Sequence, residues 1–127
     1  MLNINPSTKV FICSEPIDMR YSFDALSGLV SKHFGLNPLS GHIFVFFSRQ
    51  GDRMKLLSWD LDGFALYYKR LERGTYSWIK DLNLNEGGEI QASDFAMIVT
   101  GINPCTTMPK NKKRNAVAPR VAPLQLV

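Results

Sequence analysis

The stretch between residues 42 and 79 constrains the fold most, because short apolar runs alternate there with turn sequences at close spacing. The first run is apolar on both faces, as expected for an inner strand of a sheet. Runs of this length suit strands better than helices. We expect an antiparallel meander of four strands, over residues 42–49, 53–60, 64–72 and 75–79.

The turns between these strands contain the residue types that tight turns require. Gln50-Gly51-Asp52 separates the first two strands, and Leu61-Asp62-Gly63 separates the next two. Gly63 is able to adopt a positive φ, because glycine has no Cβ to oppose it. Arg73-Gly74 then turns the chain into the fourth strand.

The flanking segments predict one further strand and two helices. Residues 8–13 alternate polar and apolar side chains and are typical of a strand. A helix is expected over 22–34, with Ser22 as N-cap, Asp24 in the first turn and Gly35 after its end. Its apolar stripe comprises Phe23, Leu26, Leu29, Val30 and Phe34. A shorter helix follows, with Ser93 as its candidate cap and Gly101 closing it.

These elements predict an α+β fold: a meander sheet of four to five strands with one longer and one short helix packed on it. The chain has 127 residues, which fits a single domain. We assign the domain to residues 1–102 and a flexible basic tail to 103–127. No run approaches the ~18 apolar residues of a membrane helix. A cytoplasmic protein without a membrane or small-molecule partner is expected.

Positive charge is concentrated in the tail. The formal net charge is +4, yet residues 1–102 hold ten Lys and Arg against all eleven Asp and Glu. The tail holds five cations, four prolines and no acid or aromatic residue, so we expect it to be flexible. Three roles stay open for the tail: it increases solubility without a specific partner, it binds an acidic protein surface, or it binds nucleic acid. Its candidate nucleic-acid contacts are Lys110, Lys112, Lys113 and Arg114.

The predicted sheet also carries cations interleaved with aromatic residues. A basic sheet face of this kind can follow phosphates and stack bases, whereas the alternative is a solvated cationic face over core rings. Arg53, Lys55 and Trp59 share parity and are expected on one face. The candidate contacts in the domain are Arg20, Arg49, Arg53, Lys55, Lys69, Arg70 and Arg73.

The acids and cysteines do not form a catalytic or metal-binding pattern. Asp60 and Asp62 fit a turn better than a calcium loop, because position twelve counted from Asp60 is a leucine. Asp18, Arg20 and Asp24 form a polar group that is either a structural ion pair or a contact for a phosphate or a partner. Cys13 and Cys105 are far apart in sequence and are expected to be free thiols. No catalytic residue, metal or cofactor is predicted.

Three stretches, residues 17–30, 37–78 and 92–102, resemble the accessory protein encoded by the second reading frame of insertion sequence 66 elements. This protein is often called TnpB and differs from the RNA-guided nuclease of that name. The chain departs from the family pattern at Tyr21-Ser22, where Lys-Gly is usual, and at Ile79, where Pro is usual. The residues in its motifs are Asp18, Met19, Arg20, Asp24, Ser40, Gly41, His42, Trp59, Asp60, Gly63, Lys69, Arg70, Leu71 and Glu72.

The resemblance implies a helper of DNA transposition that acts beside a separate transposase, with no catalytic residues to carry over. Three functions stay open. The chain contacts element DNA through its sheet cations and tail, or it is a protein–protein adaptor that binds the transposase through aromatic side chains. The third is a magnesium-dependent nuclease that uses Asp18, Asp24, Asp60 or Asp62. This function is disfavoured because the sequence shows no recognisable set of catalytic residues.

Overall fold

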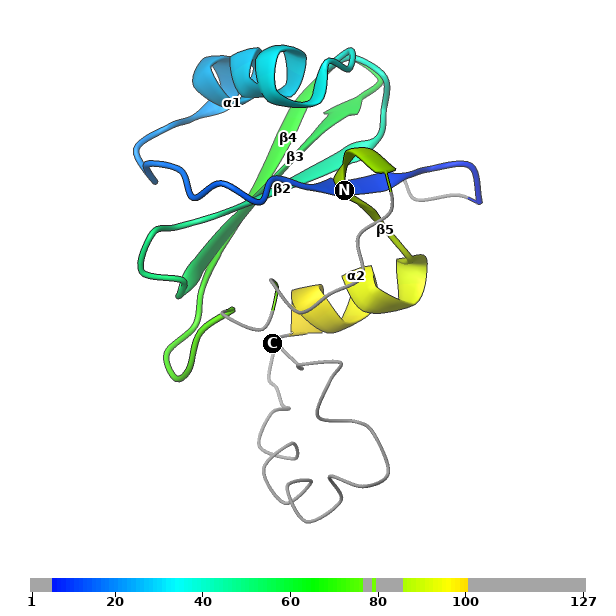
Figure 1. The fold of residues 1–127 in the computed structure, drawn as a ribbon. Coiled ribbons are helices and arrows are strands. Elements are labelled where there is room, and N and C mark those ends of the chain that lie inside the picture. Colours follow the sequence, from blue (N-terminus) through cyan, green and yellow to red (C-terminus); the bar gives the residue numbers. More distant parts are fainter. Residues whose placement is uncertain (1–5, 77–78, 80–85, 101–127) are drawn as a thin grey trace. The chain divides into compact units, whose positions relative to one another are not determined.

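The computed structural model describes residues 6–76, 79 and 86–100. The chain divides into two compact units, Met1–Ile90 and Gln91–Val127. The first contains a five-stranded sheet with helix α1, and the second contains α2, Ala92–Thr100 (Figure 1). The predicted α+β class is therefore confirmed. The predicted tail and its boundary at residue 102 lie outside the described residues. None of the described helices has the length and apolar character needed to cross a membrane.

The sheet has the strand order β4-β3-β2-β1-β5. Strands β2, β3 and β4 form an antiparallel meander, as predicted. β1 lies parallel to β2, and β5 lies antiparallel to β1. The bounds are Val10–Ile12 for β1, Ile43–Phe47 for β2, Arg53–Asp60 for β3, Gly63–Arg70 for β4 and Glu89–Ile90 for β5.

The fourth meander strand predicted at 75–79 is wrong for the described residues of that segment. Thr75, Tyr76 and Ile79 lie outside the strands, and residues 77–78 are outside the described part. After β4 the chain turns back toward the β2–β3 turn instead of pairing with β4. The Tyr76 N–H donates to the Gly51 carbonyl at 2.6 Å, and its ring lies 5.1 Å from that of Phe47. Burial of this tyrosine, 2% exposed, decides the path of the segment.

The β3–β4 hairpin also differs from the prediction in its turn. The positive φ, 57°, belongs to Leu61, whereas Gly63 already starts β4. The Asp62 N–H donates to the Asp60 carbonyl, so the chain reverses in a very tight turn. Leu61 is 85% exposed and occupies a conformation that costs a non-glycine residue about 1 kcal/mol. The hairpin tip therefore presents an apolar side chain between two carboxylates.

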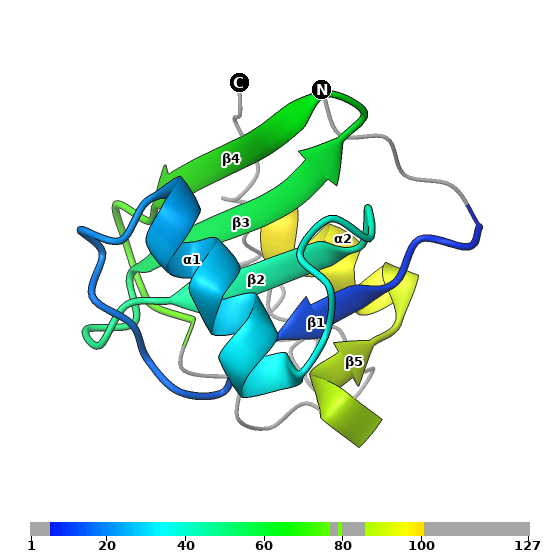
Figure 2. The ribbon, with the colours of Figure 1, turned by 90° about the horizontal axis from the view of Figure 1, so that it is seen from above.

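Helix α1, Phe23–Leu29, continues into a wider π-helical turn, η1, Val30–Phe34. Ser22 occupies the predicted N-cap position, and its carbonyl accepts the N–H of Leu26, but its side chain makes no capping bond. Gly35 ends the helix with φ 66°, as predicted. Figure 2 shows α1 and η1 crossing one face of the sheet. The second helix begins at Ala92, so the predicted cap Ser93 lies inside it.

The main core lies between α1 and this face of the sheet. Phe11, Phe44 and Leu57 form a row across neighbouring strands, and Leu26 and Val30 pack on it from the helix. Phe23 was predicted in the same stripe, but it is 42% exposed. The stripe therefore begins one turn later than the periodicity indicates.

Strand β5 is brought into the sheet by η3, Glu86–Gly88. Gly87 and Gly88 adopt φ values of 74° and 87°. A Cβ on Gly88 would lie 2.6 Å from the backbone oxygen of Ile12, whereas a Cβ on Gly87 would meet nothing within 4 Å. Only glycine at 88 allows the chain to approach β1 this closely.

We predict that Gly88→Ala lowers the free energy of unfolding by about 2 kcal/mol or more, because it adds a backbone clash to the cost of a positive φ. Gly87→Ala is the matched control and should cost only about 1 kcal/mol, since it meets the φ cost alone. Chemical denaturation of both variants measures the difference. Equal losses would contradict the close approach of Gly88 to Ile12.

Candidate nucleic-acid interface

Four arginines from two separate stretches of sequence gather at one end of the sheet. Arg49 lies in the β2–β3 turn, and Arg53, at the start of β3, is paired in register with Arg70 at the end of β4. The segment after β4 is tied to the turn because the Leu71 N–H donates to the Asp52 carbonyl at 2.7 Å. We call this region the cationic end, and its charged residues are Arg49, Asp52, Arg53, Arg70, Glu72 and Arg73.

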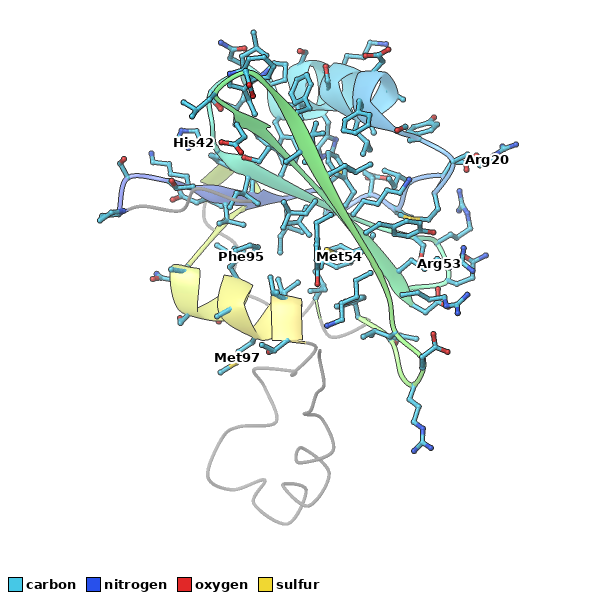
Figure 3. All side chains as sticks on the ribbon, turned by 180° about the vertical axis from the view of Figure 1, so that it is seen from behind. Arg20, His42, Arg53, Met54, Phe95 and Met97 are labelled. Atoms are coloured by element: carbon cyan, nitrogen blue, oxygen red, sulfur yellow. The ribbon has the colours of Figure 1, made fainter. Side chains whose placement is uncertain are left out.

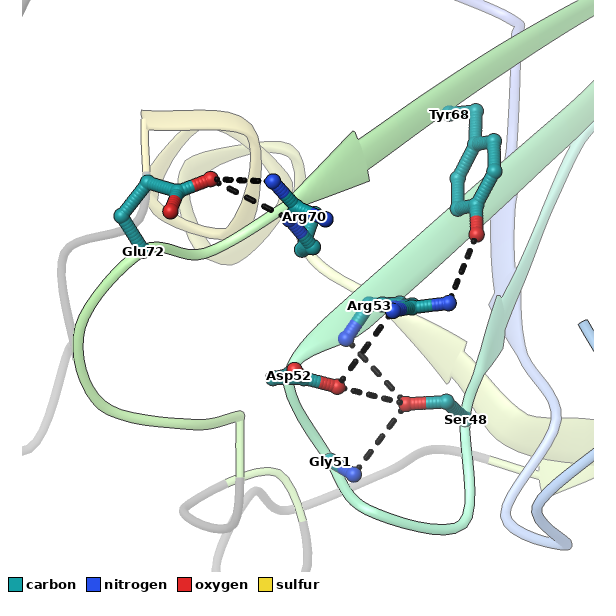
Figure 4. A network of polar contacts seen from close by, with 7 residues as sticks. All are labelled: Ser48, Gly51, Asp52, Arg53, Tyr68, Arg70 and Glu72. Carbon is teal, nitrogen blue, oxygen red and sulfur yellow. Dashed lines mark hydrogen bonds and ion pairs between the residues drawn. The ribbon is translucent and has the colours of Figure 1, made fainter.

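A buried serine fixes the turn on which the cationic end is built. Ser48 is 4% exposed, and its hydroxyl oxygen accepts the N–H groups of Gly51 and Arg53, each at 3.1 Å. The same hydroxyl donates to the Asp52 carboxylate at 3.4 Å (Figure 4). Ser48 is not among the site residues expected from the sequence. Its signal was a serine three residues before a turn glycine, a pattern in which the hydroxyl bonds the local backbone.

Arg53 and Arg70 each have a partner at the surface. The Arg53 guanidinium donates to the Tyr68 hydroxyl at 3.4 Å and lies 3.9 Å from the Asp52 carboxylate. Arg70 donates through two nitrogens to Glu72 at 3.0 and 3.1 Å (Figure 4). The Arg70 and Glu72 side chains are 58% and 77% exposed. Exposed pairs of this kind contribute only about 0–1 kcal/mol, so the guanidinium groups can exchange these partners for phosphates.

Lys55 has a different position from the other candidate cations. It shares a face of the sheet with Arg53 and Trp59, as their parity predicts, and this is the face that carries α1. Lys55 is nevertheless only 5% exposed. Its ammonium donates to the carbonyl oxygens of Met19 at 2.7 Å and Tyr21 at 2.6 Å. It also lies 4.7 Å from the centre of the Tyr68 ring. The lysine thus joins the loop before α1 to the sheet.

The same loop carries an exposed ion pair. Arg20 donates to both carboxylate oxygens of Asp18, with its shortest bond at 2.6 Å, and the Arg20 backbone N–H donates to the same carboxylate at 2.9 Å. These bonds, first from the side chain and then from the backbone, lower the pKa of Asp18 to about 2. Figure 3 shows Arg20 and Arg53 at one end of the first unit and His42 at the other.

The remaining predicted contacts are not brought to this end in the same way. Lys69 alternates with Arg70 along β4 and therefore faces the opposite side of the sheet, where burial lowers its pKa. The four tail residues Lys110, Lys112, Lys113 and Arg114 lie outside the described residues. Arg73, by contrast, is exposed in the segment after β4 that the Leu71 bond to Asp52 returns to the cationic end.

The opposite end of the β3–β4 hairpin carries two carboxylates. Asp60 ends β3 and Asp62 lies in the hairpin tip, eight residues before Arg70. Because β3 and β4 are antiparallel neighbours, the cations at the start of β3 and the end of β4 share one end and these carboxylates share the other. Together, β3 and β4 thus carry arginines at one end and carboxylates at the other.

Other residues of the family motifs shape the backbone. The Ser40 hydroxyl accepts the His42 N–H at 3.3 Å, and His42 Nδ1 accepts the Lys9 N–H at 3.1 Å. Gly41 has φ 88°, and its carbonyl accepts the Ser58 hydroxyl at 3.4 Å. These contacts hold the segment before β2 against β1 and β3. Trp59 packs edge-on against Phe64, with ring centres 5.2 Å apart.

In residues 6–76, 79 and 86–100, no group of three or more His, Cys, Asp or Glu side chains is placed to hold a metal ion. Cys13 is buried, and burial raises the pKa of its thiol. Cys105 lies outside the described residues. The site that the described geometry defines is therefore an arginine-rich surface at one end of a sheet.

Comparison with known proteins identifies the family. The sequence matches the family described as IS66 Orf2 like protein over residues 8–108. It is 35% identical over 105 residues to the uncharacterized protein y4hO of Sinorhizobium fredii (strain NBRC 101917 / NGR234), covering 81% of this chain and 88% of that protein. It is 28% identical over 116 residues to the uncharacterized protein y4jC of the same organism, covering 90% and 96%. No solved structure matches.

The chain belongs to the IS66 Orf2-like family, which confirms the resemblance drawn from the motifs. This membership suggests an accessory role in transposition, and the family is not known as catalytic.

We predict that Lys55→Met lowers the free energy of unfolding by about 2 kcal/mol, because the Met19 and Tyr21 carbonyls lose a charged donor at a buried position. Lys32→Met removes an exposed lysine from η1 and serves as control, with a change within about 0.5 kcal/mol. Urea denaturation gives both values. A Lys55 variant as stable as the control would show that the ammonium does not hold this loop.

We also predict that Arg20→Ala raises the pKa of Asp18 from about 2, without reaching the ordinary 3.8, because the backbone N–H of residue 20 still donates. Since the folded pKa is lowered, the ion pair stabilises the protein at neutral pH and is lost as pH falls from about 3.8 to about 2. An NMR titration of the Asp18 carboxyl carbon measures both values. An unchanged midpoint in the variant would contradict the pairing.

Proposed function

We propose that this protein is a non-catalytic accessory factor of transposition that contacts element DNA through the cationic end of its sheet. The observation that carries the proposal is the convergence of Arg49, Arg53, Arg70 and Arg73 at one end, with the carboxylates of Asp60 and Asp62 at the other. Family membership supports the setting in transposition.

The chemistry of the cationic end suits a nucleic-acid backbone. Guanidinium groups match phosphate geometry with two donors, and replacing counterions on the phosphates supplies sequence-independent affinity. Tyr68 is 49% exposed beside Arg53 and offers a ring for contact with a sugar or a base. Lys55 is left out of the proposed contacts because its ammonium is occupied by two carbonyls. The tail lysines and Arg114 add a second source of positive charge in this proposal.

The non-catalytic part of the proposal rests on the described side chains. The Asp18 carboxylate is bound by Arg20, and in the described part of the chain no group of three or more His, Cys, Asp or Glu is placed to hold a metal ion. We therefore assign the chemistry of strand transfer to a separate transposase, with this chain as its helper.

Fluorescence anisotropy tests the DNA contact, using the full chain and a labelled duplex from the terminal inverted repeats, with a scrambled duplex for comparison. We predict that Arg53→Gln/Arg70→Gln weakens binding and lowers the slope of log affinity against log salt by about 2, because each lost phosphate contact removes roughly 0.9. A matched control, Lys9→Gln/Lys32→Gln, removes the same charge from other exposed positions and should leave the slope near that of the parent protein.

A second variant separates the tail from the folded domain by changing Lys110, Lys112, Lys113 and Arg114 to Gln. The proposal expects it to retain the preference for the terminal repeat. Loss of all binding in the tail variant, or an unchanged slope in Arg53→Gln/Arg70→Gln, would contradict contact at the cationic end.

The alternative, an adaptor that binds the transposase without recognising DNA, is favoured by the exposed apolar side chains. They include Tyr21, Phe23, Leu39, Leu61, Tyr67 and Tyr68. An interface that buries such side chains depends far less on salt than a phosphate contact does. A chain that binds neither duplex but retains the transposase at high salt would establish the adaptor instead.

A further inference from the structure

Strand β4 forms one edge of the sheet and is much longer than the strand at the other edge. β4 has eight residues, Gly63–Arg70, and contains no proline, whereas the other edge strand, β5, has only two residues. In the part of the chain that the structure describes, no strand pairs with the outer side of β4 (Figure 2). Natural proteins usually shorten, charge or cover such an edge, because its free N–H and C=O groups attract another strand.

The hairpin register determines which backbone groups face outward. Asp60 pairs with Gly63 across the two-residue turn, so the N–H and C=O of Gly63 point to β3. Backbone groups alternate along an antiparallel strand, so those of Ala65, Tyr67 and Lys69 also point to β3. The groups that face the open edge belong to Phe64, Leu66, Tyr68 and Arg70.

We propose that β4 pairs antiparallel with β4 of a second copy of this chain, about a two-fold axis at Leu66. This register places Leu66 opposite its own counterpart and Phe64 opposite Tyr68 of the second copy. It also places Asp62 opposite Arg70 of the second copy. The two five-stranded sheets become one continuous sheet, with both α1 helices on the same face.

Charge complementarity selects the second copy as the occupant of this edge. β4 begins directly after Asp62, which carries a carboxylate, and it ends at Arg70, which carries a guanidinium group. An antiparallel copy aligns these opposite charges twice, once at each end of the paired strands. Moving the axis by one residue to Tyr67 would place Phe64 opposite Arg70 and leave Asp62 without an opposite charge.

The side chains on the other face of the sheet fit the same register. It places Ala65 opposite Tyr67 of the second copy, and Gly63 opposite Lys69. Small side chains thus face large ones, which allows the 41% exposed ring of Tyr67 to pack without a clash. The centre of the strand, from Phe64 to Tyr68, has no charged residue to oppose the contact.

Sedimentation equilibrium of the full chain without DNA, from micromolar to millimolar concentration, tests the proposal. We expect a reversible dimer. Asp62→Arg and Arg70→Asp should each weaken it about tenfold, because two symmetric attractive pairs become repulsive. The double variant Asp62→Arg/Arg70→Asp should restore dimerisation. Asp24→Arg makes the same charge change on α1, where the side chain is exposed, and should leave the dimer unaffected.

Hydrogen exchange identifies the interface residue by residue. The amides of Phe64, Leu66 and Tyr68 should become protected as concentration rises, whereas those of Ala65 and Tyr67 should be protected at every concentration. A chain that stays monomeric throughout overturns the proposal. So does a dimer that leaves the exchange of these alternating amides unchanged, or a double variant that fails to dimerise. None of these readouts uses DNA. Arg70 belongs to both proposals, so Asp62→Arg, at a residue outside the proposed DNA contact, is the variant that tests the dimer by itself.

Discussion

The arrangement of the helix and strands in the first unit depends on the hydrogen bonds that the buried Lys55 ammonium makes. A lysine at the middle of a sheet needs acceptors for its protons, and the carbonyls of Met19 and Tyr21 supply two of them. This contact joins segments 34 and 36 residues apart and fixes the chain immediately before α1. The helix can then lay Leu26 and Val30 over the phenylalanines of β1 and β2. The ion pair of Asp18 with Arg20 tightens the same loop from its exposed side.

The second constraint is the antiparallel pairing of β2, β3 and β4. It brings arginines that are distant in sequence to one end of the strands and leaves Asp60 and Asp62 at the other end. Arg53 and Arg70 are far apart in sequence, yet the register places them side by side. The Ser48 hydroxyl holds the turn beneath them, and the Leu71 bond to Asp52 returns the next segment to the same end. A surface that suits phosphates therefore follows from strand pairing and does not need a dedicated motif.

Much of this arrangement could be predicted, because the meander strands, the first helix and its glycine end all leave local signals. The parallel pairing of β1 with β2 could not, since alternation along a strand does not indicate its neighbour. The strand expected at 75–79 failed because burial of Tyr76 overrides the local pattern.

Lys55 showed the limit of prediction most clearly. Its parity correctly grouped it with Arg53 and Trp59 on one face, but only the path of a distant loop makes it a buried structural lysine and not an exposed one. Leu61 is similar, because the positive φ fell on the leucine although a glycine stood two residues away. The gathering of the arginines was visible only as cations interleaved with aromatic residues along the predicted sheet, and Ser48, which supports them, left only a faint local signal.

Whether the cationic end contacts DNA can be measured by mapping amide chemical shifts of the full chain during titration with a short duplex from the terminal repeat. We predict that the largest changes fall on residues 49–53 and 70–74, while the amides of the acidic hairpin tip at 60–62 stay unchanged. Changes centred on the hairpin tip, or none in either segment while the duplex is bound, would contradict it.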